Sequence, residues 1–167
     1  MKILLTCFQY VKVVNFITAR PLNHRLFANL CSEMGAEQKH LLLCTEVRWL
    51  SRGRVVPRVF ELRDELLLFL NEHNRMLAQF LTDEMYVARL AYLADIFSIL
   101  NSLNLSLQGP DTNVLKTHDK VDAFRKKLRI WKGRCEEGTY DMFPLLADFL
   151  TVNNISMGVI ASTVLNH

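Results

Sequence analysis

Apolar residues recur along this sequence at the spacing of an α-helix, and this periodicity constrains the fold more than any other feature. Within residues 55–69, 93–107 and 121–135 they alternate in steps of three and four. Such steps place the apolar side chains on one face of a helix, as in the seams of helical bundles. Glycine and proline are scarce, at 6 and 4 of 167 residues, so helices can be long. The sequence therefore predicts a mainly helical protein.

Turn-forming residues set the expected helix boundaries. Pro21 ends a helix over residues 10–19, and Asn23 is expected to cap a second helix that Gly35 stops. Pro57 predicts that the next helix starts near that residue, because proline fits the first turn of a helix and not its interior.

The second half of the chain has equally clear stops. Gly109 and Pro110 end the second long helix, and Asp111 or Thr112 is expected to cap the third. Gly138 ends that third helix. In all, about seven helices are expected.

One short apolar run does not fit the helical pattern. Leu41-Leu42-Leu43-Cys44 follows a turn, is too short for a helix of its own and suits a buried strand. A single strand leaves its backbone donors and acceptors without neighbours. Two interpretations stay open: the run is helical, or its sheet partners lie outside this chain. In the second case, residues 1–45 are expected to be the least stable part of the isolated chain.

The composition excludes several classes of protein. Half of the residues are apolar and 22% are charged, which is unlike a disordered chain. The net charge of +3 is a mild basic bias, so the distribution of charge matters more than its sum. No window approaches the roughly 20 apolar residues of a membrane-spanning helix without a charge, and Lys12 interrupts the apolar N-terminus. We expect a soluble, intracellular protein with no membrane partner.

The four cysteines indicate reduced thiols rather than a metal site. Cys7, Cys31, Cys44 and Cys135 form no Cys-x-x-Cys pair, and no histidine lies at zinc-finger spacing from them. We expect mostly buried thiols in an intracellular protein, with no metal and no cofactor.

No set of residues in the sequence predicts catalysis. Glu61, Asp64 and Glu65 lie one turn apart, but Arg58 and Arg63 interleave with them, which favours a salt-bridged, exposed helix face over an acid–base pair. No nucleophile elbow, phosphate-binding loop or zinc-protease motif is present. We therefore expect that the chain is not an enzyme.

Other acidic residues have structural explanations. Asp83 and Glu84 lie where a helix should begin, and they favour the positive end of its dipole. Asp95 falls on the polar side of its helix with Ser98 and Ser102, so we expect it to be solvated.

Basic residues gather in two clusters, which are the candidate binding sites. A basic stripe beside an exposed aromatic side chain can neutralise phosphates and stack on an unpaired base. The alternative is an ordinary solvated helix face, and for the second cluster it is the favoured interpretation. The first cluster comprises Arg48, Arg52, Arg54 and Arg58 with Trp49 among them, and the second comprises Arg125, Lys126, Lys127, Arg129, Lys132 and Arg134.

Several segments resemble one family of proteins. Residues 43–53, Leu-Cys-Thr-Glu-Val-Arg-Trp-Leu-Ser-Arg-Gly, resemble the Thr-x-x-Arg-Trp-x-Ser signature of hAT DNA transposases, in the form found in vertebrate host genes derived from them. Those relatives include zinc-finger BED-domain-containing proteins and general transcription factor II-I repeat-domain proteins. The segments 13–17 with 22–25, 59–66, 103–109 and 124–128 are similar to the same subgroup.

The resemblance implies a fold. In that family an RNase H-like catalytic domain uses three acidic metal ligands, and a large helical domain is inserted between the second and the third. By resemblance, residues 1–45 are an incomplete RNase H-like α/β remnant of two helices and one strand, and residues 46–167 are part of the helical insertion domain. Two ligands would then lie upstream of Met1 and the third beyond His167, and the zinc-binding BED finger and dimerisation segment would be absent.

The resemblance also suggests a function. Arg48 and Trp49 match the family's Arg-Trp pair, which lies by the active site and helps to handle distorted DNA; core packing is the alternative role for this pair. We expect a non-catalytic fragment of a domesticated transposon that retains nucleic-acid binding in the nucleus. The alternative is a helical module that docks on protein partners or on itself without binding DNA. Salt-dependent DNA binding separates these two hypotheses.

Overall fold

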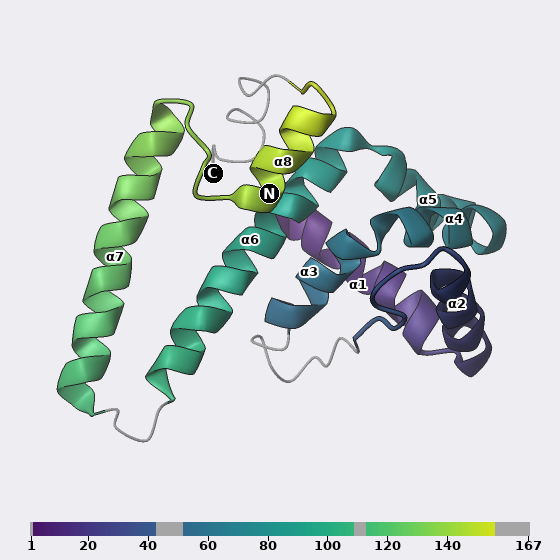
Figure 1. Ribbon diagram of the computed structural model, residues 1–167, viewed down its shortest axis with the longest axis horizontal. Helices are drawn as coiled ribbons and strands as arrows, with labels where there is room; N and C mark the ends of the chain where they lie inside the picture. Colours follow the sequence, from purple (N-terminus) through teal and green to yellow (C-terminus); the bar gives the residue numbers. More distant parts are fainter. Residues whose placement is uncertain (1, 43–51, 109–112, 156–167) are drawn as a thin grey trace.

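The computed structural model describes residues 2–42, 52–108 and 113–155, and every regular element within them is an α-helix (Figure 1). The mainly helical fold class is therefore confirmed. The helices are α1 (Lys2–Thr18), α2 (Pro21–Glu33), α3 (Arg52–Glu61), α4 (Arg63–His73), α5 (Arg75–Thr82), α6 (Glu84–Leu107), α7 (Val114–Glu136) and α8 (Pro144–Val152).

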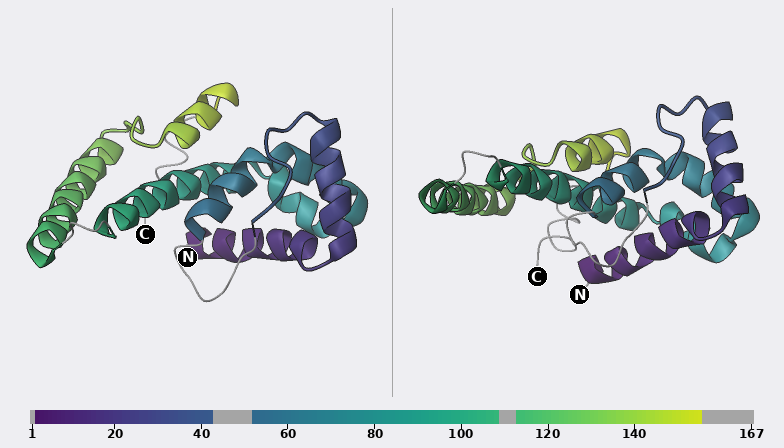
Figure 2. Two further views of the ribbon diagram at one scale, coloured as in Figure 1. Left: turned by 60° about the horizontal axis from the view of Figure 1, so that its bottom comes forward. Right: turned by 90° about the horizontal axis from the view of Figure 1, so that it is seen from below.

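The other helices are arranged around α6. Helices α1, α3, α5, α7 and α8 all contact it, and Figure 2 shows it running through the middle of the molecule. Helix α3 approaches α6 closely because Gly53 has no side chain. A Cβ atom at that position would lie 3.2 Å from the Cβ of Asn101 and 3.4 Å from the carbonyl oxygen of Phe97.

By length and composition alone, α6 is able to span a membrane, which the sequence pattern did not suggest. Its surroundings explain its apolar character in another way. Five helices contact it, and its first half supplies buried residues such as Leu90 and Ala94 to the core. Asp95 is buried beside them. We therefore interpret the first half of α6, which supplies the buried residues between Tyr86 and Phe97, as the core segment of this fold.

The seam over residues 55–69 is buried as predicted, although a break divides its helix. Helix α3 ends at Glu61 and α4 begins at Arg63. The chain still keeps helical hydrogen bonds across the break, such as the one from the Leu66 amide to the Leu62 carbonyl oxygen (2.9 Å). Five seam residues are at most 2% exposed: Val55, Val59, Leu62, Leu66 and Phe69.

The predicted start of this helix at Pro57 is wrong. Helix α3 begins at Arg52, and Pro57 lies inside it. Val55 and Val56, which precede the proline, are buried in the core. This packing stabilises the first turns of α3 although Pro57 supplies no backbone N–H group.

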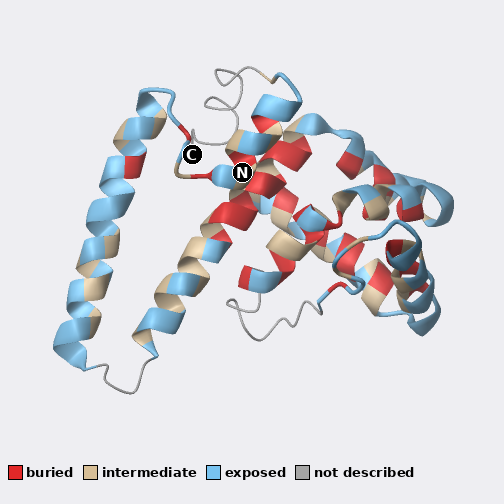
Figure 3. Ribbon diagram, in the orientation of Figure 1, coloured by how far each residue is buried: buried red, intermediate tan, exposed pale blue. Residues whose placement is uncertain are grey.

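The seam over residues 93–107 is covered only in part. Leu93 is buried, whereas Ile96, Leu100, Leu103 and Leu107 are half-buried. The C-terminal half of α6 extends beyond the body of the molecule, where α7 runs alongside it (Figure 3). The periodicity therefore located the apolar face correctly but overestimated its burial.

Asn23 does not cap α2 as predicted. Its side-chain nitrogen Nδ2 donates a hydrogen bond to the carbonyl oxygen of Phe16 in α1 (3.0 Å), so it ties the two helices together. Arg20 occupies the N-cap position and Pro21 the first turn of α2. Gly35 adopts a φ of +74°, the left-handed conformation that ends helices, so its predicted role is confirmed.

The predicted strand over Leu41–Cys44 is wrong for the half that the structure describes. Leu41 and Leu42 belong to no regular element, and Leu43 and Cys44 lie outside the described residues. Leu41 is 4% exposed because it packs into the helical core, which accounts for its apolar character without a sheet. The RNase H-like remnant and the domain boundary at residue 45 stay predictions.

Asp95 is the largest departure from expectation among the acidic residues. It is 4% exposed rather than solvated. Its carboxylate oxygens accept hydrogen bonds from the backbone amides of Leu145 (3.3 Å) and Leu146 (3.1 Å). Asp95 thus caps the N-terminus of α8, whose own N-cap residue, Phe143, offers no polar side chain.

The acidic start of α6 is confirmed. A side-chain oxygen of Asp83 accepts a hydrogen bond from the backbone amide of Met85 (2.9 Å). The salt-bridged helix face is confirmed for two of its three carboxylates, because Arg58 pairs with Glu61 (3.1 Å) and Arg63 with Asp64 (3.7 Å). Glu65 departs from the prediction: its side chain is half-buried, and its Oε2 is buried without a hydrogen-bond partner.

Candidate nucleic-acid interface

The described residues of the first basic cluster do not come together as a binding site. Arg48 and Trp49 lie outside them, and Arg52 forms the start of α3. Arg54 is exposed. Arg58 is half-buried and engaged within the molecule, with its Nε 3.1 Å from a carboxylate oxygen of Glu61 and its Nη1 donating to the carbonyl oxygen of His40 (3.2 Å). The predicted role of this cluster therefore stays a prediction.

The second basic cluster lies on α7, a helix of 23 residues. Asn113 caps it, with its side-chain oxygen accepting a hydrogen bond from the Lys116 amide (2.8 Å). The predicted caps, Asp111 and Thr112, lie outside the described residues. Helix α7 occupies one edge of the molecule, and α6 lies between it and α3 (Figure 1).

The charge of the chain is concentrated on α7. This helix carries eight lysine or arginine residues and three acidic residues, a net charge of +5. The whole chain carries +3, so everything outside α7 is net −2. Two of the eight, Lys116 and Lys120, were missed because they lie outside the dense cluster at 125–134. A count of charge over the whole predicted helix would have found them.

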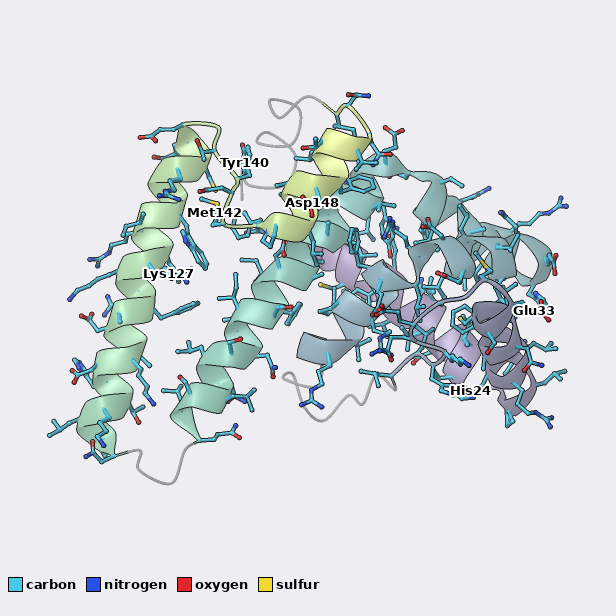
Figure 4. The ribbon with its side chains drawn as sticks, viewed as in Figure 1. His24, Glu33, Lys127, Tyr140, Met142 and Asp148 are labelled. Atoms are coloured by element: carbon cyan, nitrogen blue, oxygen red, sulfur yellow. The ribbon has the colours of Figure 1, made fainter. Side chains whose placement is uncertain are left out.

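The four predicted site residues on α7 are all exposed but differ in their contacts. Lys126 pairs with Asp122 (3.0 Å), and this ammonium group lowers the pKa of the Asp122 carboxyl. Lys127, labelled in Figure 4, places its ammonium nitrogen 4.8 Å from the centre of the Trp131 ring. Arg125 and Arg129 lie one helical turn apart, on the same side of α7. The structure therefore brings Arg125, Lys126 and Arg129 together on an exposed face.

Aromatic packing fixes the C-terminal end of α7 to the body. Trp131 is 8% exposed and packs edge-on against Phe124 (6.4 Å between ring centroids) and Phe143 (5.8 Å). Phe143 packs in the same way against Tyr92 of α6 (5.0 Å). Nearby, Nη1 of Arg134 donates hydrogen bonds to both carboxylate oxygens of Asp141 (3.2 and 2.9 Å). These contacts join the C-terminal end of α7 to the segment before α8 and, through Phe143, to α6.

A groove of about 450 Å³ separates α6 from α7 on one side of their contact. Lys120 crosses it and donates a hydrogen bond to the carbonyl oxygen of Ser106. The groove is lined by Ile99, Ser102, Leu103 and Ser106 of α6 and by Lys120, Ala123, Phe124 and Lys127 of α7.

The thiols and carboxylates of the described residues form no metal site. No three His, Cys, Asp or Glu side chains converge there. Cys31 is buried, and Cys7 and Cys135 are half-buried, whereas Cys44 lies outside the described part. Burial raises the pKa of the Cys31 thiol to about 11, so this side chain is an unreactive core group.

The fold and this surface define a class: an all-helical domain, in the part described, whose charge is carried by one edge helix. Comparison with known proteins identifies the family. Residues 4–136 match the FAM200/GTF2IRD2 helical domain, and the chain belongs to that FAM200-GTF2IRD2-like family. Membership supports a domesticated, transposon-derived protein.

A curated relative is similar over most of this chain. The general transcription factor II-I repeat domain-containing protein 2 of Bos taurus is 38% identical over 136 residues, which is 81% of this chain. The matched region covers 14% of that longer protein. No solved structure matches the fold. The resemblance to the II-I repeat-domain proteins is therefore confirmed by comparison.

Proposed function

We propose that this chain is a non-catalytic, nuclear domain of hAT-transposase descent that binds nucleic acid through the outer face of α7. Its relative in cattle is named as a transcription-factor repeat protein, which supports a nuclear regulatory setting. Arg48, Trp49, Arg52 and Arg54, on and before α3, are a second proposed contact region.

The concentration of charge on α7 carries this proposal. A helix of 23 residues is about 35 Å long, close to one turn of duplex DNA. Along it, Arg125, Lys126 and Arg129 present exposed cationic groups within two turns. Such groups displace the counterions of the phosphate backbone and bind it without reading its sequence.

The proposal predicts weak, salt-dependent binding to duplexes of any sequence. Labelled 20-base-pair duplexes would be titrated with the chain at 50 and 200 mM salt, with fluorescence anisotropy as the readout. We expect Lys126→Glu combined with Arg129→Glu to weaken binding about tenfold or more. The salt slope should fall by roughly 0.9 for each lost phosphate contact.

The matched control makes the same change of charge away from α7. Arg25 in α2 and Arg75 in α5 are both exposed, so Arg25→Glu with Arg75→Glu removes equal charge. This control should bind DNA nearly as well as the unmodified chain. Equal losses in the two double variants would show that only net charge matters and would refute an α7 interface.

The non-catalytic part of the proposal is tested separately. The pure chain would be incubated with Mg²⁺ or Mn²⁺ and a supercoiled plasmid, with nicking followed on a gel. We expect no cleavage above that of a mock preparation. Reproducible metal-dependent nicking that copurifies with the chain would overturn this part and leave the binding proposal standing.

A further inference from the structure

Helix α7 carries an apolar repeat of seven residues that the described part of the chain covers on one side only. Val114, Val121 and Leu128 recur at every seventh position. We name these three residues the α7 seam. Phe124 and Trp131 follow Val121 and Leu128 by three positions, the spacing of a coiled coil, whereas Thr117 takes that place after Val114.

Helix α6 covers the aromatic half of this pattern and leaves the seam exposed. Trp131 is 8% exposed and Phe124 is half-buried. By contrast, Val114, Val121 and Leu128 are 85%, 39% and 41% exposed. The α6–α7 pair thus resembles a three-helix packing in which, among the described residues, the helix that would cover the α7 seam is missing.

Five of the six positions that flank the repeat hold lysine or arginine, and the sixth holds His118. One flank holds His118, Arg125 and Lys132, and the other holds Lys120, Lys127 and Arg134. In coiled coils these flanking positions select the partner by charge. No acidic side chain occurs at any of the six.

The two flanks differ in how far the molecule itself engages them. On the second flank, Lys120 bonds to Ser106, Lys127 lies over Trp131 and Arg134 pairs with Asp141. On the first flank, Arg125 is exposed and Lys132 lies 3.9 Å from Glu136 of the same helix. Residues 96–107 of α6 contain no charged residue that could neutralise either flank.

We infer that the α7 seam is a docking site for a partner helix whose own apolar heptad is flanked by Asp or Glu. Such a helix buries the α7 seam and places its carboxylates beside Arg125 and Lys132. A second copy of this chain does not fit, because Arg125 and Lys132 of one copy would face the like-charged flanks of the other. A nucleic-acid partner would explain the basic charge of the flanks, but it would not explain why three apolar residues recur at every seventh position.

This inference shares one residue, Arg125, with the proposed DNA contact. Lys126 and Arg129 occupy neither the seam nor its flanking positions, so each surface has test residues of its own. Either interaction can fail without the other.

The test uses the whole chain and a synthetic probe. The probe is a labelled 28-residue peptide with Leu and Ile at the heptad core and Glu at the flanks, which keep it monomeric. Two control peptides carry Lys at the flanks or the same composition in scrambled order. Anisotropy titrations should show binding of the acidic peptide at least about tenfold tighter than of either control.

Two double variants identify the surface. Val121→Asn with Leu128→Asn should weaken binding of the acidic peptide at least about tenfold, because two exposed apolar contacts are lost. Arg125→Glu with Lys132→Glu should weaken the acidic peptide and strengthen the Lys-flanked one, a switch that misfolding cannot produce. Both changes fall on exposed positions, and circular dichroism melts check that the variants stay folded.

Four results would overturn the inference. The first two are that the acidic peptide does not bind, and that the scrambled peptide binds as tightly as the acidic one. The third is that the seam variant loses as much DNA binding as peptide binding, which would make the surface a nucleic-acid face. The fourth is that the chain forms a dimer in sedimentation and that the seam variant abolishes this dimer, which would assign the surface to a second copy.

Discussion

Asp95 shows how one buried side chain can position a helix that lies far along the chain. It sits in α6 and accepts hydrogen bonds from the amides of Leu145 and Leu146, at the start of α8. Pro144 has no amide to offer, so these two amides are among the first free donors of that helix. A carboxylate at this place also faces the positive end of the helix dipole.

Replacing this carboxylate should destabilise the protein. We expect Asp95→Ala to lower the free energy of unfolding by about 2–3 kcal/mol, because two backbone amides lose their acceptor in a buried place. Chemical denaturation followed by circular dichroism measures the change. The control is Asp148→Ala, on an exposed position of α8, which should cost about 0.5 kcal/mol or less. Similar losses in both variants would contradict the capping role.

The stability that Asp95 contributes should depend on pH. Burial raises the pKa of its carboxyl above the ordinary value of 3.8, although the bonds from Leu146 and Leu145 oppose this shift. A carboxyl whose pKa rises on folding stabilises the fold most at pH values below its unfolded pKa. That contribution is lost as the pH rises through the folded pKa. The unfolding free energy of the unmodified chain, relative to Asp95→Asn, should therefore fall as the pH rises from the ordinary carboxyl pKa of 3.8 through the higher pKa of the folded state. A rise over this range would show that the charged form is favoured.

The sequence could not predict Asp95 because its partners lie 50 and 51 residues away. Its neighbours Ser98 and Ser102 suggested a polar, solvated face. One signal was present: α8 begins with Pro144 after Phe143, without a polar cap of its own. A helix start of this kind needs an acceptor from elsewhere, but sequence alone does not tell which one.

At the scale of the helices, periodicity predicted which faces are apolar but not what covers them. The seam over residues 55–69 is buried throughout, because α3 and α4 lie among other helices. The seams over 93–107 and 121–135 face each other over part of their length and otherwise lie beyond the body. The basic face of α7 was found from the sequence, because charge density along one helix requires no knowledge of tertiary contacts.

Two leucines of α6 test this difference within one helix. Leu90 is fully buried in the body, and Leu100 is half-buried in the part beside α7. We expect Leu90→Ala to cost about 2–5 kcal/mol of unfolding free energy and Leu100→Ala about 1 kcal/mol. Urea denaturation of both variants measures the two costs. If Leu100→Ala were the more damaging change, the exposed arrangement of α6 and α7 would be wrong.

At the scale of the whole molecule, the core joins the N-terminal helices to the rest of the chain. Tyr10, Val14 and Ile17 of α1 are fully buried, and α1 contacts α2, α3, α5 and α6. Phe27 of α2 packs edge-on against Phe69 of α4 (5.6 Å between centroids). The family match over residues 4–136 also continues across the predicted domain boundary at residue 45. A chain descended from parts of two ancestral domains can still fold around one shared core of this kind.

Amide hydrogen exchange should therefore locate the weakest part of the chain in α7. A partnerless strand at residues 41–44 would make residues 1–45 exchange fastest. The structure predicts the opposite, because one face of α1 is buried against four helices whereas α7 contacts mainly α6 and is anchored by Trp131. Amides in Tyr10–Ile17 should exchange as slowly as those in the first half of α6, since both open only with the whole core.

Amides near Val121 should exchange faster by orders of magnitude, and binding of an acidic helix to the α7 seam should slow them selectively. Mass-spectrometric exchange on the full chain measures both. Fast exchange throughout α1 with slow exchange in α7 would show that the N-terminal helices are not part of the stable core.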